Sequence, residues 1–189
     1  MEKEILYIHG YGSSGSTGRI LEKLLNGYCK VHHFSIPVNP DDAFIKINKY
    51  LGNHPEISLI VGSSLGGFIA SRFNGYLKLL INPCMHPSIE LPKLGCDTDI
   101  SDIYYKYEDY DFLDLEEKLS TYLMFGTKDE LFSYKAECEK YYIKKNISSM
   151  EGITHHLNEK ELNEFVVPMI KNILEVESPI LNEHFEHSF

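Results

Sequence analysis

Short apolar runs alternate along this chain with segments that have helical spacing of apolar residues. Each run has four to six residues, and we predict each of them as a buried strand. The runs are residues 5–8, 31–36, 57–61, 77–81, 121–125 and 147–150. Because strands and helices alternate from end to end, the pattern predicts an α/β fold with a parallel, doubly wound sheet.

The segments between these runs predict the helices. Residues 17–25, 133–142 and 158–174 place apolar side chains on one face, and Pro168 is positioned to kink the last of these helices. A further helix is expected from Pro40 to Leu51, because a proline suits the first turn of a helix. Another is expected from the end of the third strand through Phe73. Residues 84–118 break the alternation, and we interpret them as a small cap inserted between the fourth and fifth strands.

The composition suits a single globular domain. The chain has 189 residues, of which 43% are hydrophobic and 24% charged, and we assign residues 1–175 to the domain and 176–189 to a tail. With 18 basic and 28 acidic residues the net charge is −10. Phosphate backbones and anionic membranes are bound by clustered basic faces, so nucleic acid and membrane surfaces are not expected partners.

The location of the protein is also constrained by the sequence. No apolar run approaches the roughly 20 residues that span a bilayer, and the N-terminal apolar run is too short for a signal peptide. The cysteines at 29, 84, 96 and 138 are widely spaced, which favours free thiols in a reducing compartment. We therefore predict a cytoplasmic protein without membrane insertion, and leave its oligomeric state open.

A candidate nucleophile follows the third strand. The sequence from Gly62 to Gly66 fits the pattern G-x-S-x-G with Ser64 at its centre. A tight strand-to-helix turn of this kind lifts the serine hydroxyl above the edge of the sheet, and side chains at the two glycines would collide. The pattern predicts Ser64 as a nucleophile, and a turn of small residues without catalysis is the alternative.

A serine nucleophile acting on an acyl group needs two N–H donors for the oxyanion. Leu65, which follows the serine, supplies one. The second candidate is the N–H of Tyr11, which lies between two glycines in the loop after the first strand. His9 at the start of this loop is a conceivable base, but a histidine that holds the loop by hydrogen bonds is the simpler interpretation.

The same loop permits a different function. Residues 10–15 read G-x-G-x-x-G, the motif of dinucleotide sites, which also requires an acidic residue about 20 positions later at the end of the second strand. The second strand here ends without an acid, and Asp41 and Asp42 are better placed to cap a helix. We therefore predict no cofactor, and keep dinucleotide binding as a minor alternative.

The base and its orienting acid follow in the order expected for this type of sheet. Asp129 and Glu130 come after the fifth strand, and His155 and His156 come after the sixth. The spacing from the preceding glycine favours Asp129 as the acid, with Glu130 as the alternative. We prefer His155 as the base, and His156 remains the alternative.

Three other features have competing interpretations. Cys84 with His86 suggests a thiol nucleophile, but a half-buried free cysteine is simpler beside Ser64. The pair His184 and His187 suggests a metal site, but we predict none, there or at the two adjacent histidines. Residues 97–117 contain nine acids, one lysine and several aromatics, which indicates either a solvated acidic helix and loop or a lid whose aromatics line an acyl pocket.

The motifs together resemble a known family. The segments ILYIHGYGSS, LIVGSSLGGF, INPCMHP, FGTKDE and EGITHH are similar to those of the small bacterial YqiA/YcfP-type esterases of the α/β-hydrolase superfamily, over residues 5 to about 172. The resemblance implies an α/β-hydrolase fold without its two leading antiparallel strands. It also implies a triad of Ser64, Asp129 and His155 with an oxyanion hole at Tyr11 and Leu65.

From the motifs and the resemblance we expect about six strands in the order 2-1-3-4-5-6 with helices on both faces. The expected activity is hydrolysis of a small-molecule carboxylic ester or acyl thioester through an acyl-enzyme. A non-catalytic binding module with the same fold is the alternative of a different class.

Overall fold

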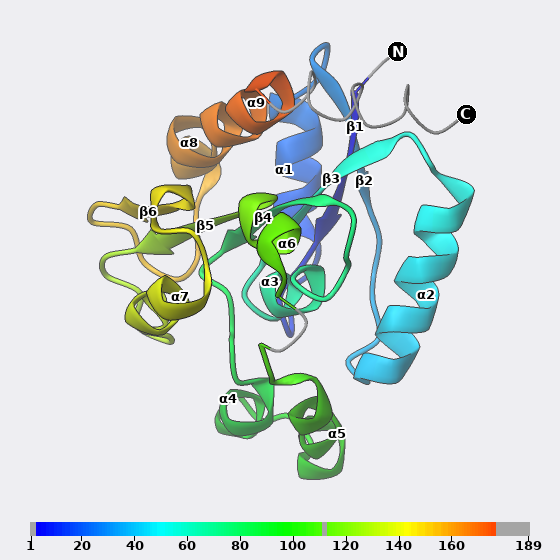
Figure 1. Ribbon diagram of the computed structural model, residues 1–189, viewed down its shortest axis with the longest axis vertical. Helices are drawn as coiled ribbons and strands as arrows, with labels where there is room; N and C mark the ends of the chain where they lie inside the picture. The colour runs from blue at the N-terminus through cyan, green and yellow to red at the C-terminus, as the bar shows by residue number, and fades with distance from the viewer. Residues whose placement is uncertain (1–2, 111–112, 177–189) are drawn as a thin grey trace.

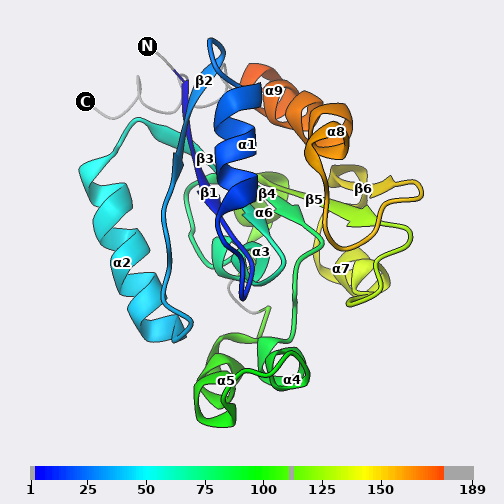
Figure 2. The same cartoon turned by 180° about the vertical axis from the view of Figure 1, so that it is seen from behind.

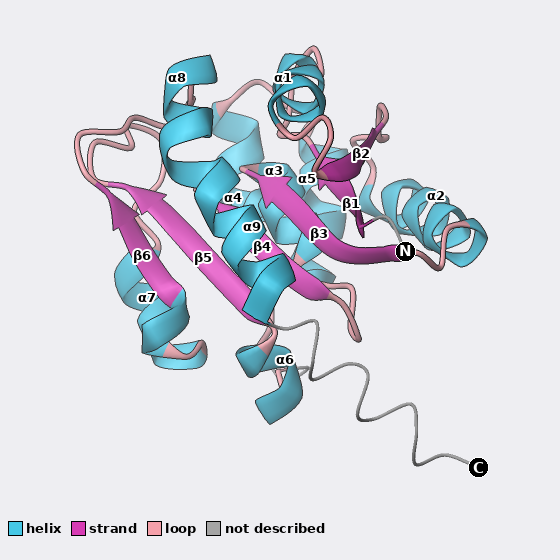
Figure 3. Ribbon diagram, turned by 90° about the horizontal axis from the view of Figure 1, so that it is seen from above, coloured by secondary structure: helices cyan, strands magenta, loops and turns pink. Residues whose placement is uncertain are grey.

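Six parallel strands form one sheet in the order β2-β1-β3-β4-β5-β6, as predicted (Figure 3). The computed structural model describes residues 3–110 and 113–176. The strands are β1 (Lys3–Ile8), β2 (Cys29–His33), β3 (Ile57–Ser63), β4 (Leu77–Ile81), β5 (Thr121–Gly126) and β6 (Ile147–Met150). Their carboxyl ends lie at one edge of the sheet, which is where ligands bind in folds of this class.

Helices cover both faces of the sheet. One apolar core lies between the sheet and helices α1 (Ser16–Leu24) and α9 (Val167–Val176), which Figure 2 shows from their side of the molecule. The other core lies under α2 (Pro40–Asn53), α3 (Leu65–Ala70) and α7 (Lys135–Tyr141). Alternate residues of each strand point into the two cores, as Ile5 and Leu6 of β1 do. This double burial explains why the strands read as unbroken apolar runs.

Several predicted boundaries differ from the observed ones by two residues or more, and the ends of the second strand and of the helix after the third strand differ by three. The second strand ends at His33 rather than at residue 36, and side chains from other elements hold the segment that follows it. Lys46 donates to the Ser35 carbonyl, and Tyr104 donates to the Val38 carbonyl at 2.6 Å. Helix α3 ends at Ala70, before the predicted end, because the following residues form tighter turns with bonds to the third residue back.

The last predicted helix consists of three parts. Asn158 and Glu161 form a capping box at the start of α8 (Glu159–Glu161), and a π-helical turn, η3 (Leu162–Val166), joins α8 to α9. Pro168 lies in the first turn of α9 and has no N–H to donate. The carbonyl group one turn earlier therefore lacks the hydrogen bond that it would accept in a regular helix. The wider π-helical turn directly before Pro168 accommodates this carbonyl group.

The segment between β4 and β5 forms a separate lobe beyond the carboxyl end of β4 (Figures 1 and 2). It contains α4 (Pro87–Lys93), α5 (Thr98–Tyr104) and the 3₁₀ turn η1 (Tyr105–Tyr107), and α6 (Leu115–Leu119) leads back to the sheet. A further 3₁₀ turn, η2 (Lys144–Asn146), precedes β6. None of the described helices is long and apolar enough to cross a bilayer.

The acidic and aromatic residues of this lobe have specific structural roles rather than forming a uniformly solvated face. Asp97 and Asp114 cap α5 and α6, and Glu117 is buried against the ammonium group of Lys78. Tyr104 is fully buried and packs edge-on against Phe68 of α3. The lobe is therefore anchored to the core of the domain. Residues 111–112 and the tail from 177, with its two histidines, lie outside the described residues.

Candidate active site

Ser64 occupies a sharp turn between β3 and α3. Its backbone angles are φ 55° and ψ −123°, an uncommon conformation for a residue with a side chain. A Cβ atom on Gly62 would lie 2.2 Å from the Gly66 carbonyl oxygen, and one on Gly66 would lie 2.1 Å from the carbonyl oxygen of Ile8. Both positions therefore admit only glycine, as the steric argument from the sequence predicts.

The loop after β1 lies directly against this turn. A Cβ atom added to Gly10 would lie 2.9 Å from the Cβ of Ser64. The Ser13 N–H donates to the Gly10 carbonyl, and Gly12 has φ 67°, so residues 10–13 form a tight turn with Tyr11 at its tip. Leu65 is the first residue of α3, and its N–H has no partner within the helix. The N–H groups of both predicted donors thus belong to backbone segments that adjoin the serine.

His9 is held by its own loop. Its Nδ1 lies 2.8 Å from the carbonyl oxygen of Gly10, which agrees with the interpretation of this histidine as a structural residue. Cys84 is fully buried, and burial raises the pKa of its thiol far above the ordinary value. A thiolate at this position is strongly disfavoured, so the structure gives no support to a cysteine nucleophile.

Asp129 and His155 form a buried pair. The Nδ1 of His155 lies 2.9 Å from the Oδ2 of Asp129, and the two side chains are only 2% and 4% exposed. The Oδ1 of Asp129 accepts the N–H groups of Leu131 and Phe132 at 2.8 and 2.9 Å. Burial raises the pKa of Asp129, but these hydrogen bonds and the one to His155 outweigh it, so the net pKa lies below its ordinary value. The carboxylate is therefore ionised at neutral pH and accepts the imidazole N–H.

The two alternatives left open by the sequence occupy different positions. Glu130 accepts the backbone N–H of His155 at 3.0 Å rather than contacting the imidazole, and this bond lowers the pKa of its carboxyl. His156 is exposed, with its ring 5.0 Å from that of His155. Glu130 thus fixes the backbone of the histidine loop, while Asp129 contacts the ring of His155.

Asn82 connects two parts of this site, a role that the sequence analysis did not assign to it. It follows β4 with φ 43°, a left-handed conformation that asparagine tolerates better than most residues. Its Oδ1 accepts the N–H of Gly126 at 2.7 Å, and its Nδ2 donates to the carbonyl groups of Thr154 and His155 at 3.2 and 3.1 Å. Asn82 therefore connects the end of β5, which precedes Asp129, to the loop that carries His155. An asparagine at the end of a buried strand is the signal that could have indicated this role.

A cavity of about 480 Å³ brings Ser64 and His155 to one surface. Its walls are the loop after β1, the end of β3 and the loop after β6. Eight of its fifteen lining residues carry a hydroxyl group. The hydroxyl-bearing residues are Tyr7, Tyr11, Ser13, Ser14, Ser16, Thr17, Ser63 and Ser64. Among the described residues, those that line the cavity do not come from 97–117, so the expectation that aromatics of this segment form an acyl pocket finds no support.

Comparison with known proteins agrees with this fold. Residues 4–171 match the model of an uncharacterised protein family, UPF0227, which confirms the family resemblance drawn from the sequence. No curated protein matches the chain.

Solved structures with the same fold include several hydrolases. A monoacylglycerol lipase from Paleococcus ferrophilus has a TM-score of 0.62 at 18% identity, over 91% of this chain and 94% of that one. An α/β hydrolase from a sediment metagenome of the Mar Chica lagoon, Morocco, has a TM-score of 0.72 at 13% identity, over 91% and 92%. A type II thioesterase of the yersiniabactin pathway has a TM-score of 0.62 at 14% identity, over 93% and 94%. The chain thus has the α/β-hydrolase fold.

Proposed function

The chain belongs to the UPF0227 family, and from this membership and the geometry around Ser64 we propose that it is a serine hydrolase that cleaves a carboxylic ester or acyl thioester. The observation that carries the proposal is the buried Asp129–His155 pair, joined at 2.9 Å, whose histidine lines the same cavity as Ser64. The strained turn at Ser64 supports the same assignment, because such strain persists where function requires it.

The proposed reaction has two steps. His155 accepts the proton of the Ser64 hydroxyl as its oxygen attacks the acyl carbon, and the protonated imidazole then passes this proton to the leaving alcohol or thiol. The N–H groups of Tyr11 and Leu65 bind the oxyanion in both steps. Asp129 holds the imidazole by its Nδ1–H and stabilises its positive charge. Water, activated by His155, then releases the acid from Ser64, and no cofactor enters the reaction.

The cavity also favours a class of substrate. Its hydroxyl-rich wall suits an acyl or alcohol group that carries hydrogen-bonding atoms, and its volume is at the lower end for small-molecule sites. We therefore expect short or hydroxylated esters to be better substrates than long-chain acyl esters, and a series of p-nitrophenyl esters of graded chain length measures this preference.

The experiment that tests the proposal is intact-mass spectrometry after treatment with a fluorophosphonate. One adduct is expected on the unsubstituted protein and none on Ser64→Ala. Ser63→Ala is the matched control, because Ser63 lines the same cavity but its hydroxyl lies 2.6 Å from that of Tyr7. Labelling that is lost in Ser63→Ala and kept in Ser64→Ala would assign the nucleophile to Ser63 instead of Ser64. A folded protein without any adduct would contradict the proposal and favour a non-catalytic binding module.

A second pair of variants tests the base. His155→Gln should lower kcat by about 10⁴ or more, as removal of a triad base does. His156→Gln should change kcat little, because His156 is exposed and makes no contact with Asp129 that would orient it. Steady-state kinetics with a p-nitrophenyl ester measure both. The reverse result would assign the base to His156.

A further inference from the structure

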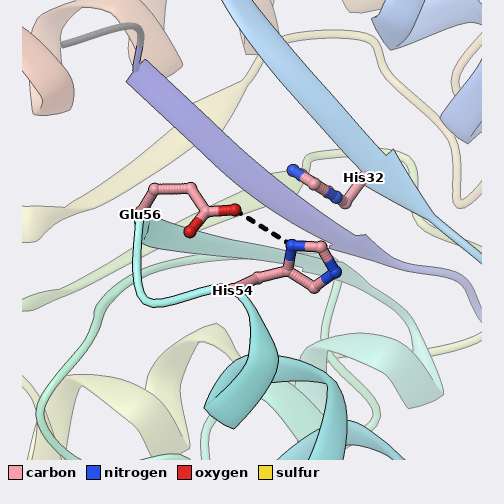
Figure 4. A group of neighbouring side chains, drawn as sticks. All are labelled: His32, His54 and Glu56. Atoms are coloured by element: carbon pink, nitrogen blue, oxygen red, sulfur yellow. Dashed lines mark hydrogen bonds and ion pairs between the residues drawn. The ribbon is translucent and has the colours of Figure 1, made fainter.

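Three metal-compatible side chains meet between α2 and the sheet. His32 lies in β2, His54 follows the last residue of α2, and Glu56 directly precedes β3 (Figure 4). One donor atom from each residue lies within 4.8 Å of the other two. Within residues 3–110 and 113–176, no other group of three histidine, cysteine or acidic residues meets this condition. This cluster has no part in the proposed hydrolysis, because β3 separates it from the serine.

Two of the three donors are already at the spacing that a metal ion requires. The Nδ1 of His54 lies 2.9 Å from the Oε1 of Glu56 (Figure 4). Neighbouring ligand atoms in a tetrahedral zinc site are about 3.3 Å apart, as follows from metal–ligand distances of about 2.0 Å. A short turn fixes this pair, because the Ile57 N–H donates to the His54 carbonyl at 3.1 Å and the His54 N–H donates to Leu51 at 3.0 Å.

The third donor, His32, is oriented by its neighbours. Glu4 of β1 contacts its Nε2, and the Tyr50 hydroxyl lies 2.7 Å from its Nδ1. Metal-binding histidines usually place their second nitrogen against a carboxylate in this way. The ring is buried and its centroid lies 5.0 Å from that of His54. Because both nitrogens have partners, a metal ion at one of them displaces either Tyr50 or Glu4, and the contact to the other remains to orient the ring.

The charges around the cluster also favour a cation. Glu4 and Glu56 contribute two carboxylates, and Lys30, which pairs with Glu4 at 3.1 Å, offsets one of them. The two carboxylates therefore outnumber the one lysine beside them, on a protein whose total charge is −10.

We propose that His32, His54 and Glu56 bind a divalent transition-metal ion, with zinc as the best fit to two imidazoles and a carboxylate. The ion joins β2, the end of α2 and the start of β3, which are otherwise linked here by side-chain contacts. Such a site stabilises the fold. His32 lies 22 residues before His54 in the sequence, which explains why no metal-binding motif is visible there.

Zinc titration by calorimetry of the full-length protein, after treatment with EDTA, tests this site. One zinc ion should bind with an affinity that falls at least about tenfold in His54→Gln and in Glu56→Gln. At free zinc about 100 times the Kd, the melting temperature of the parent should rise by roughly 5–10 °C. Both substituted side chains are at least partly exposed, so the variants should fold, and fluorophosphonate labelling of Ser64 should persist in both.

His33→Gln is the matched control. His33 adjoins His32 and pairs with Glu22 at 3.2 Å, but no third donor joins that pair. It should keep the affinity of the parent. Equal zinc affinity in the parent, His54→Gln and Glu56→Gln would overturn the proposal, as would an equal loss in His33→Gln. Cobalt provides a separate test on the unsubstituted protein. The visible absorption of tetrahedral cobalt should appear on binding and disappear when zinc is added, and a spectrum of hydrated cobalt alone would count against the site.

Discussion

Replacing Asn82 with aspartate isolates one contribution to the geometry of the proposed triad. The two side chains have the same shape, and aspartate keeps the oxygen that accepts the Gly126 N–H. It loses the NH₂ group that donates to the carbonyl groups of Thr154 and His155. Asn82→Asp therefore removes the link to the histidine loop while it preserves the link to β5.

The magnitude follows from the local environment. Two hydrogen bonds are lost, at about 1 kcal/mol each, and a buried oxygen now faces two carbonyl oxygens, which adds about 1–3 kcal/mol. We expect a loss of about 3–5 kcal/mol in the free energy of unfolding at neutral pH. The new carboxyl should take up a proton to restore one bond, so its folded pKa should be raised. Stability from a raised pKa is present at low pH and lost as the pH rises through that pKa, so the loss should be smaller at pH 5 than at pH 8.

Asn146→Asp is the matched control for this prediction. Asn146 is also buried, and its Nδ2 donates to the carbonyl groups of Leu119 and Thr121 at 3.0 and 3.3 Å, near the start of β5. Urea unfolding should show a comparable loss of stability in both variants. Only Asn82→Asp should lower kcat, by about 10², because a displacement of about 1 Å in a catalytic group has an effect of that size. Equal kcat in Asn82→Asp and the parent would refute the role of Asn82, and an equal fall in both variants would show a general effect of stability.

Three further predictions concern the turn, the acid and the cap. Gly66→Ala should destabilise the fold by about 3 kcal/mol and reduce fluorophosphonate labelling, because the added Cβ would meet backbone atoms. Gly52→Ala is its control: Gly52 lies in α2 with open space around it, so this variant should be more stable than the parent by about 0.5–1 kcal/mol in urea unfolding. Asp129→Asn should be less stable than the parent at pH values above the ordinary carboxyl pKa of about 3.9. This difference in stability should shrink as the pH falls through the lowered pKa of Asp129 in the folded protein. Thermal melts at pH 3 and pH 7 measure both effects. Tyr104→Phe should lower stability by about 1–2 kcal/mol, because the Val38 carbonyl loses its donor, and retained stability would contradict the anchoring of the cap.

The fold was predictable because its signals are local. A strand that is buried on both faces has no polar side to interrupt it, so β4 was predicted with its observed ends. The end of β2 was not, because the segment that follows it is held by Lys46 and Tyr104, which bind the carbonyl groups of Ser35 and Val38 from other elements. Strand ends set by side chains from distant segments leave no trace in the periodicity of the strand itself.

In the candidate site, too, one part is predictable from local sequence and another depends on residues that are distant in the sequence. The turn at Ser64 depends on the glycines two residues before and after it, so five consecutive residues are enough to predict it. The choice between Asp129 and Glu130 depends on which carboxylate reaches the ring of a histidine about 25 residues away. The structure places Asp129 against the ring and Glu130 against the backbone, and kinetic tests of the substituted proteins decide whether the pair acts in catalysis.

The aromatic segment 97–117 shows where composition alone misleads. Tyrosines interleaved with acids are equally compatible with a lid over a pocket and with a lobe anchored to the core. Tyr104 donates its hydroxyl to a backbone carbonyl and buries its ring against Phe68, so an amphipathic side chain here serves to dock the lobe. The wall of the cavity next to Ser64 comes instead from the serine-rich loop after β1. If the proposed hydrolysis is correct, selectivity for the acyl group resides in that loop, and its hydroxyl groups rather than the tyrosines of the cap distinguish one substrate from another.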